Sequence, residues 1–132
     1  MILYLWIFLG AGLGGIARFA LSGLVAQHFG GSFPWGTLVI NVTGSFIIGF
    51  FATLTAPGDG KFLAGETGRQ FVMTGFLGGY TTYSAFSLQT LDLARGGQWL
   101  YAGAYTGGTL VLCFVAVWLG HVCALALGNL RA

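Results

Sequence analysis

The segment Gly75–Ser87, with sequence GFLGGYTTYSAFS, places glycines and hydroxyl side chains in the middle of a long hydrophobic run. Glycine inside a helix costs about 1 kcal/mol relative to alanine, and threonine side chains compete for backbone hydrogen bonds. The segment therefore predicts an interruption, with one helix ending near Gly78 and a second beginning near Thr82. The alternative is an unbroken helix in which Gly75 and Gly79 form a GxxxG packing contact.

Such an interruption would offer two kinds of ion site. The last carbonyl groups of the first helix, near Gly78 to Thr81, suit a hard cation, and the first N–H groups of the second helix suit an anion. Tyr83 and Phe86 share a face of the second helix, and aromatic ring edges carry positive charge density. Two ring edges beside amide and hydroxyl groups predict a site for a small anion. Taken alone, the aromatic pair is explained more simply by core packing.

Polar residues recur on one face of the second hydrophobic run. Thr37, Asn41 and Ser45 are spaced four residues apart, so they align on a helix. The Asn41 amide must find hydrogen-bond partners inside a membrane. Its partner is either a neighbouring helix or a polar track that the amide faces as a donor, and the alignment favours the track.

Two further polar residues lie in the first and last runs. Thr109 shares a helix face with Tyr105 and Cys113; it either contributes to a polar track or bonds back to its own helix. Arg18 lies within the first run, where an arginine is costly. It either reaches the membrane interface with its long side chain or provides a positive charge that attracts anions at a vestibule.

The composition indicates an all-α integral membrane protein. Of the 132 residues, 56% are hydrophobic and 6% are charged, whereas about a quarter of the residues of a soluble domain are charged. The net charge of +2 is too small to indicate nucleic acid as a partner. No cluster of His, Cys, Asp or Glu has metal-ligand spacing, and no catalytic nucleophile stands out, so the sequence does not indicate an enzyme.

Four hydrophobic runs predict a single domain of four transmembrane helices, with the third one broken in the middle of the membrane. Pro and Gly residues indicate a loop from about Ala56 to Thr67. Gly10 with Gly14, and Gly103 with Gly107, have the spacing of helix-packing seams. The expected spans cover about residues 2–26, 35–55, 69–95 and 100–127.

Positive charges specify the orientation of the chain only weakly. Lys61, Arg69 and Arg131 fall on one side of the expected membrane, and Arg95, with Arg18, falls on the other. Either orientation is therefore open to the chain, which would allow an antiparallel pair. Four helices of this length do not easily pack and also enclose a wet pore, so the polar faces predict a symmetric homodimer.

Three segments together resemble one known family, the Fluc (CrcB) fluoride channels. Gly75–Ser87 resembles the GFxGGxTTFSTF signature of that family. Gly36–Phe46, with sequence GTLVINVTGSF, resembles its GTLxxNxxGxF segment, and Gly14–Arg18 resembles its GxxxR pattern. The resemblance covers essentially the whole chain, and the longest motif is specific.

The resemblance implies an antiparallel, dual-topology homodimer in the bacterial inner membrane, through which fluoride leaves the cell passively. It also implies a sodium ion at the dimer centre, held by the backbone carbonyls of Gly78 and Thr81. Arg18 would lie at a vestibule. The implied fluoride pathway comprises Thr37, Asn41, Thr82, Tyr83, Ser84, Phe86 and, by a looser match, Thr109.

The chain departs from the family motif at two positions. Tyr83 replaces the first phenylalanine of TTFSTF, and Ala85 replaces its threonine. A tyrosine keeps the ring but adds a hydroxyl group. Either this hydroxyl points away and the ring edge still serves the anion, or it rearranges the pathway.

Two other classes of protein fit the composition. A small dual-topology transporter for cationic drugs is expected to keep an acidic residue within a span for proton coupling. Asp59 and Glu66 instead lie in the expected loop and Asp92 near a span end, which disfavours this class. A non-conducting subunit of a membrane assembly would not require polar faces on the second and fourth spans.

Overall fold

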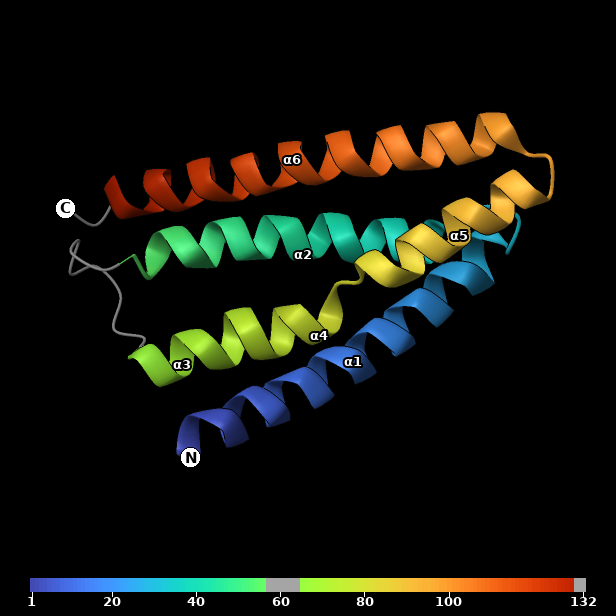
Figure 1. Cartoon of the computed structure of the whole chain (residues 1–132). Helices are drawn as coiled ribbons and strands as arrows, with labels where there is room; N and C mark the ends of the chain where they lie inside the picture. Colours follow the sequence, from blue (N-terminus) through green and yellow to red (C-terminus); the bar gives the residue numbers. More distant parts are fainter. Residues whose placement is uncertain (57–64, 130–132) are drawn as a thin grey trace.

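The computed structural model describes residues 1–56 and 65–129, and every regular element in these ranges is a helix (Figure 1). The π-helical segment η1 continues α3 and leads directly into α4, so residues 66–80 form one continuous helical piece. The elements are α1 (Ile2–Phe29), α2 (Trp35–Leu54), α3 (Glu66–Gln70), η1 (Phe71–Leu77), α4 (Gly78–Tyr80), α5 (Tyr83–Arg95) and α6 (Trp99–Asn129).

Three helices in the described part of the chain, α1, α2 and α6, are long and apolar enough to cross a membrane. The third expected span, 69–95, is not among them because it is divided into the piece 66–80 and α5. Each of these pieces is shorter than the about 20 residues that a crossing helix needs. The two pieces together have the length of one span.

The helix boundaries differ from the expected spans at two places. Glu66 and Thr67, which the sequence places in a loop, begin α3; the Glu66 carboxylate lies in the first turn, where the helix dipole favours negative charge. Helix α1 continues past residue 26 and ends at Phe29, where it is followed by Gly30, whose φ of 77° favours glycine. The rest of the expected loop, residues 57–64, and the C-terminal Arg131 lie outside the described residues.

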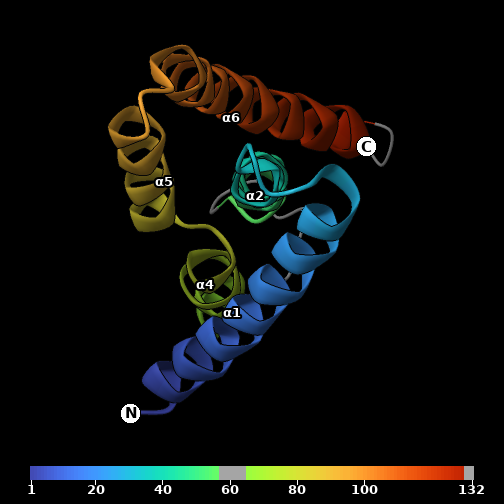
Figure 2. The same cartoon turned by 90° about the vertical axis from the view of Figure 1, so that its right-hand side faces the viewer.

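Helix α2 is the central element of the arrangement (Figures 1 and 2). It runs alongside α6, while α1 packs along η1 and α4 on the other side. Helix α5 leaves the end of α4 and leads to α6 (Figure 2). Ile40, Leu77 and Tyr80 form the buried cluster where α2 meets the helical piece that precedes α5.

Glycine seams hold α1 against η1 and α4. A Cβ on Gly14 would overlap the carbonyl oxygen of Phe76, and a Cβ on Gly79 would overlap that of Ala11. A Cβ on Gly10 would overlap the Phe71 carbonyl oxygen and would lie 3.0 Å from the Gly75 Cα. The packing seam predicted at Gly10 and Gly14 is confirmed, and its counterpart is the glycine face of the third hydrophobic segment.

The glycine pair of α6 behaves differently. A Cβ on Gly103 or Gly107 would meet no atom within 4 Å. Helix α6 instead approaches α2 through Gly120, where an added Cβ would overlap the carbonyl oxygen of Phe46. Gly103 and Gly107 therefore form no packing seam with the part of the chain that the structure describes.

Candidate functional site

The third helix is interrupted at Thr81 and Thr82. Helix α4 ends at Tyr80, Thr81 is extended with φ −84° and ψ 162°, and Thr82 is extended with φ −154° and ψ 119°. The Thr82 hydroxyl accepts a hydrogen bond from the backbone N–H of Ala85 at 3.2 Å and so caps the start of α5. The interruption predicted in this segment is confirmed, and the unbroken-helix alternative is wrong.

The side chain of Asn41 on α2 binds both backbone groups of Thr82. Its Nδ2 donates to the Thr82 carbonyl at 3.0 Å, and its Oδ1 accepts from the Thr82 N–H at 2.8 Å. An extended residue directs its N–H and C=O to the same side, as in a pair of strands, so one carboxamide satisfies both. Both residues are buried. Asn41 thus hydrogen-bonds a neighbouring segment and keeps one Nδ2 proton for a further acceptor.

Two more residues of α2 hold the end of α4. The Thr43 hydroxyl donates to the Val39 carbonyl at 2.7 Å, which leaves its oxygen to accept the Tyr80 hydroxyl proton at 2.8 Å. A Cβ on Gly44 would overlap the Thr81 side chain. Helix α2 therefore contacts three consecutive residues at the interruption, Tyr80, Thr81 and Thr82.

A cavity of about 320 Å³, here termed the break cavity, lies beside the interruption. It is lined by α2, by residues on both sides of the break and by α6. Gly78 is exposed there, and Thr81 is half-buried. The break cavity brings together most of the expected site residues: Asn41, Gly78, Thr81, Thr82, Tyr83, Phe86 and Thr109.

Thr109 contributes an unsatisfied hydroxyl group to the break cavity. Its side chain is 5% exposed, and its Oγ1 has no hydrogen-bond partner among the described residues. The alternative that Thr109 bonds back to its own helix is therefore wrong. Buried polar atoms are almost always paired, so an orphaned hydroxyl beside a cavity indicates a missing partner.

The aromatic pair of α5 lies at the same cavity. The ring centroids of Tyr83 and Phe86 are 5.6 Å apart with the planes tilted by 53°, and Phe86 also packs against Tyr105 at 5.2 Å. Phe86 is 5% exposed, whereas Tyr83 is 76% exposed. Core packing within the chain accounts for Phe86 but not for Tyr83, whose ring lies on the open side of the cavity.

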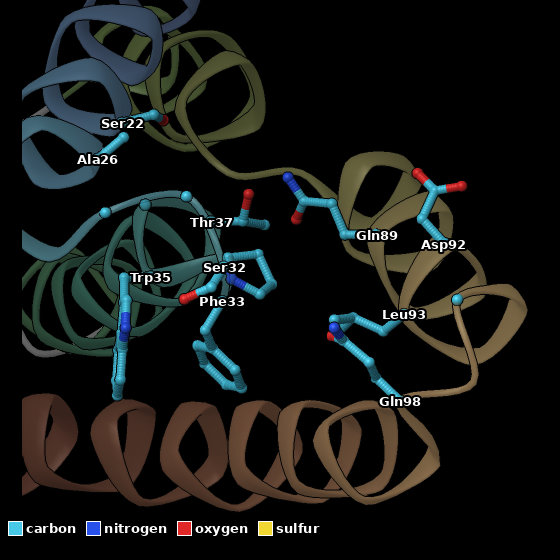
Figure 3. Close-up of a pocket in the computed structure, with 15 residues that line it drawn as sticks. Ser22, Ala26, Ser32, Phe33, Trp35, Thr37, Gln89, Asp92, Leu93 and Gln98 are labelled. Carbon is cyan, nitrogen blue, oxygen red and sulfur yellow. The ribbon is translucent and has the colours of Figure 1, made fainter.

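A second cavity of about 490 Å³, the mouth cavity, lies where the connection between α1 and α2 approaches α5 and the start of α6 (Figure 3). Thr37 and Gln89 point towards each other across it (Figure 3). The side-chain oxygen of Gln89 also accepts the Tyr105 hydroxyl proton at 2.9 Å. The mouth cavity is also lined by the polar residues Ser22, Ser32 and Gln98.

Arg18 lines a groove between α1, α2 and α5 that shares lining residues with both cavities. The groove shares Thr37 and Gln89 with the mouth cavity and Thr82 with the break cavity. Arg18 is half-buried. Of the expected site residues, Thr37 and Arg18 thus line the groove and not the break cavity. Ser84 is exposed and contacts the Thr82 hydroxyl at 3.3 Å.

Gln89 is the site residue that the sequence interpretation missed. It follows Phe86 by three residues, so the helical face that carries the aromatic pair continues through it. An uncharged amide inside a hydrophobic segment needs a partner as much as Asn41 does. Helical spacing from Phe86 is the signal that could have identified it.

The chain is similar to known proteins over nearly its full length. Residues 5–121 match the family model described as CrcB-like protein, Camphor Resistance (CrcB). A protein from Opitutus terrae named "Fluoride-specific ion channel FluC" is 67% identical over 99% of this chain and 98% of its own length. Proteins of the same name from Methylocella silvestris and Rhodospirillum rubrum are each 54% identical, over 97% and 96% of this chain and 97% of their own lengths. The family resemblance of the motifs is confirmed: the chain belongs to the CrcB-like family.

Proposed function

We propose that this protein is a fluoride-selective ion channel that releases fluoride passively across the membrane. The observation that carries this proposal is the break cavity, which combines the Phe86 ring, the Asn41 amide and the unpaired Thr109 hydroxyl. Fluoride is small and accepts strong hydrogen bonds, so uncharged donors and ring edges can replace its water without trapping it. The name of the relatives, fluoride-specific ion channel, supports the same function.

The proposed route runs from the mouth cavity through the Arg18 groove to the break cavity. Arg18 supplies positive charge on the approach, where it raises the local concentration of anions. Thr37 and Gln89 lie at the junction of the mouth cavity and the groove. No step of this route requires covalent chemistry, so the protein acts as a channel rather than as an enzyme.

We place the chain in the bacterial inner membrane with four crossings. Helices α1, α2 and α6 would provide three of them, and the piece 66–80 followed by α5 would provide the fourth. The interruption then falls near the membrane midplane, where free backbone groups are tolerated only inside protein or beside a wet cavity. The Asn41 amide and the break cavity meet this requirement.

The functional unit in this proposal is an antiparallel homodimer. The ring of Tyr83 and the backbone of Gly78 lie on an open side of the single chain, and a second copy would cover them. Gly103 and Gly107 have room for a closely approaching helix. The weak charge bias of the sequence is compatible with both orientations.

A structural sodium ion fits between the two copies. Gly78 and Thr81 line the open break cavity, and carbonyl oxygens at the end of a helix suit a hard cation. Among the described residues, no group of His, Cys, Asp and Glu has a metal-binding arrangement. Backbone and hydroxyl oxygens are therefore the ligands that this part of the chain offers, and the ion would neutralise the negative ends of two facing half-helices.

Ion efflux from liposomes that contain the purified protein tests the function. Fluoride and chloride electrodes would record both ions from the same liposomes, with protein-free liposomes as the control. The expected result is rapid fluoride release with retention of chloride. Equal release of both ions, or release of neither by a folded protein, would contradict the proposal.

A further inference from the structure

Two backbone N–H groups at the interruption donate to side chains instead of continuing the helix. In an unbroken α-helix, the Thr82 N–H would donate to the Gly78 carbonyl, and the Ala85 N–H would donate to the Thr81 carbonyl. The Thr82 N–H instead donates to Asn41 Oδ1 at 2.8 Å, and the Ala85 N–H donates to Thr82 Oγ1 at 3.2 Å. The carbonyls that lose these donors belong to the two residues proposed to hold sodium.

We propose that Asn41 and the Thr82 hydroxyl are positioning residues that create the cation site by capturing these two N–H groups. Neither side chain needs to touch the ion. Each removes the helical donor of one carbonyl oxygen, so that the oxygen is free to bind a cation. This inference rests on the proposed sodium site and assigns its formation to side chains of the same chain.

The surroundings of both contacts support this assignment. Asn41 is 9% exposed and Thr82 is 8% exposed, so water does not compete effectively for the redirected N–H groups. Asn41 also binds the Thr82 carbonyl, which holds Thr82 in its extended conformation. The Tyr80 hydroxyl binds Thr43, which lies on α2 as Asn41 does, and this contact fixes the last residue of α4. The two carbonyls are thus released in a chain segment that α2 holds in place.

Sodium-dependent thermal unfolding of the full-length protein in detergent tests the proposal. Sodium would be titrated against N-methylglucamine at constant ionic strength for the wild type, Asn41→Ala and Thr82→Val. We expect each variant to raise the sodium concentration for half-maximal stabilisation by about tenfold or more, as loss of residues that orient metal ligands commonly does. Asn41→Asp keeps the oxygen that accepts the Thr82 N–H and should retain a sodium response.

Thr55→Val is the matched control, because Thr55 is a buried threonine whose hydroxyl, among the described residues, binds only the Phe51 carbonyl of its own helix. It should lower thermal stability at most slightly and leave the sodium midpoint unchanged. A wild-type sodium midpoint in both Asn41→Ala and Thr82→Val would overturn the proposal. If Asn41→Ala does not fold, an unchanged midpoint in Thr82→Val alone overturns it. Absence of any sodium effect on the wild type would instead refute the sodium site, and fluoride efflux would still test the channel separately.

Discussion

The two halves of the interrupted helix are held in different ways. The first half, residues 66–80, packs against α1 with backbone nearly touching backbone at Gly14 and Gly79. The second half, α5, meets α6 through side chains, including the Phe86–Tyr105 ring contact and the hydrogen bond from Tyr105 to Gln89. Tyr83, Leu88 and Leu91 of α5 are each more than half exposed.

This difference indicates a division of roles. The first half is fixed by contacts within the chain, so it can present carbonyl groups in a defined position. The second half carries the Tyr83 ring on a side that the single chain leaves open, while Phe86 is buried behind it. We therefore assign cation binding to the end of the half that α1 fixes, where two copies would meet, and anion passage to the aromatic side of the half that a second copy would cover.

The largest expected effect comes from Gly14→Ala, which tests the fixed half. The new methyl group would overlap the Phe76 carbonyl oxygen, and overpacking against backbone costs about 1–3 kcal/mol or more. We expect a strong loss of folded protein, measured by yield and thermal unfolding. Gly15→Ala is the control, because a Cβ there meets nothing within 4 Å. Equal destabilisation by both would refute the glycine seam.

Gly78→Leu tests the exposed end of the fixed half, which lies at the centre of the proposed dimer. A Cβ on Gly78 meets only the Met73 carbonyl oxygen at 3.9 Å, an ordinary contact, and leucine favours helix over glycine by about 0.8 kcal/mol. The single chain should therefore fold, while the dimer and its fluoride flux are lost. Mass measurement in detergent would detect the change. Gly23→Leu, at another open position, should leave the dimer intact. A dimeric Gly78→Leu protein would contradict the placement of the partner.

Phe86→Leu tests the ring edge as an anion ligand. The substitution keeps a large apolar side chain, so it should cost less than the about 3–5 kcal/mol of a change from phenylalanine to alanine. Fluoride efflux should fall by about tenfold or more, equivalent to about 1.4 kcal/mol of barrier. Phe114→Leu, at an exposed phenylalanine of α6, provides the control. Wild-type flux in Phe86→Leu would remove this ring from the pathway.

The smallest expected effect is that of Tyr83→Phe. No hydrogen bond of the Tyr83 hydroxyl is formed with the described residues, and its ring is exposed, so stability should change by no more than about 0.5 kcal/mol. If the ring edge serves the anion, efflux should stay close to wild type, whereas Tyr83→Leu should reduce it. A large loss of flux in Tyr83→Phe would show that the hydroxyl itself contacts the ion.

The sequence predicted the local features of this site better than its long-range contacts. The glycines and threonines of Gly75–Ser87 predicted the interruption because their cost inside a helix is local. The cost of burying an amide likewise predicted that Asn41 needs a hydrogen-bond partner. That partner, Thr82, lies 41 residues away, and its position is set by how α2 packs against the break. The spacing of Gly103 and Gly107 likewise identifies a packing surface without identifying what packs on it.

The π-helical segment η1 was also absent from the sequence prediction. It covers Phe71–Leu77, which reads as an ordinary hydrophobic helix with one glycine. Its Gly75 packs closely against Ile7 and Gly10 of α1, and such a contact is a tertiary property that the segment alone does not reveal. The family motifs identify the residues at the break, and the contacts show how α2 holds them.

The central claim is that two chains together form one unit that conducts fluoride. Dilution of the protein in liposomes tests this claim most directly. The fraction of liposomes that release fluoride would be measured as the number of chains per liposome is lowered, with chloride followed in parallel. The account predicts one active unit for every two chains and no chloride release at any dilution. A releasing fraction that corresponds to one active unit for every single chain would contradict this claim. Chloride release that accompanies fluoride release would contradict it as well.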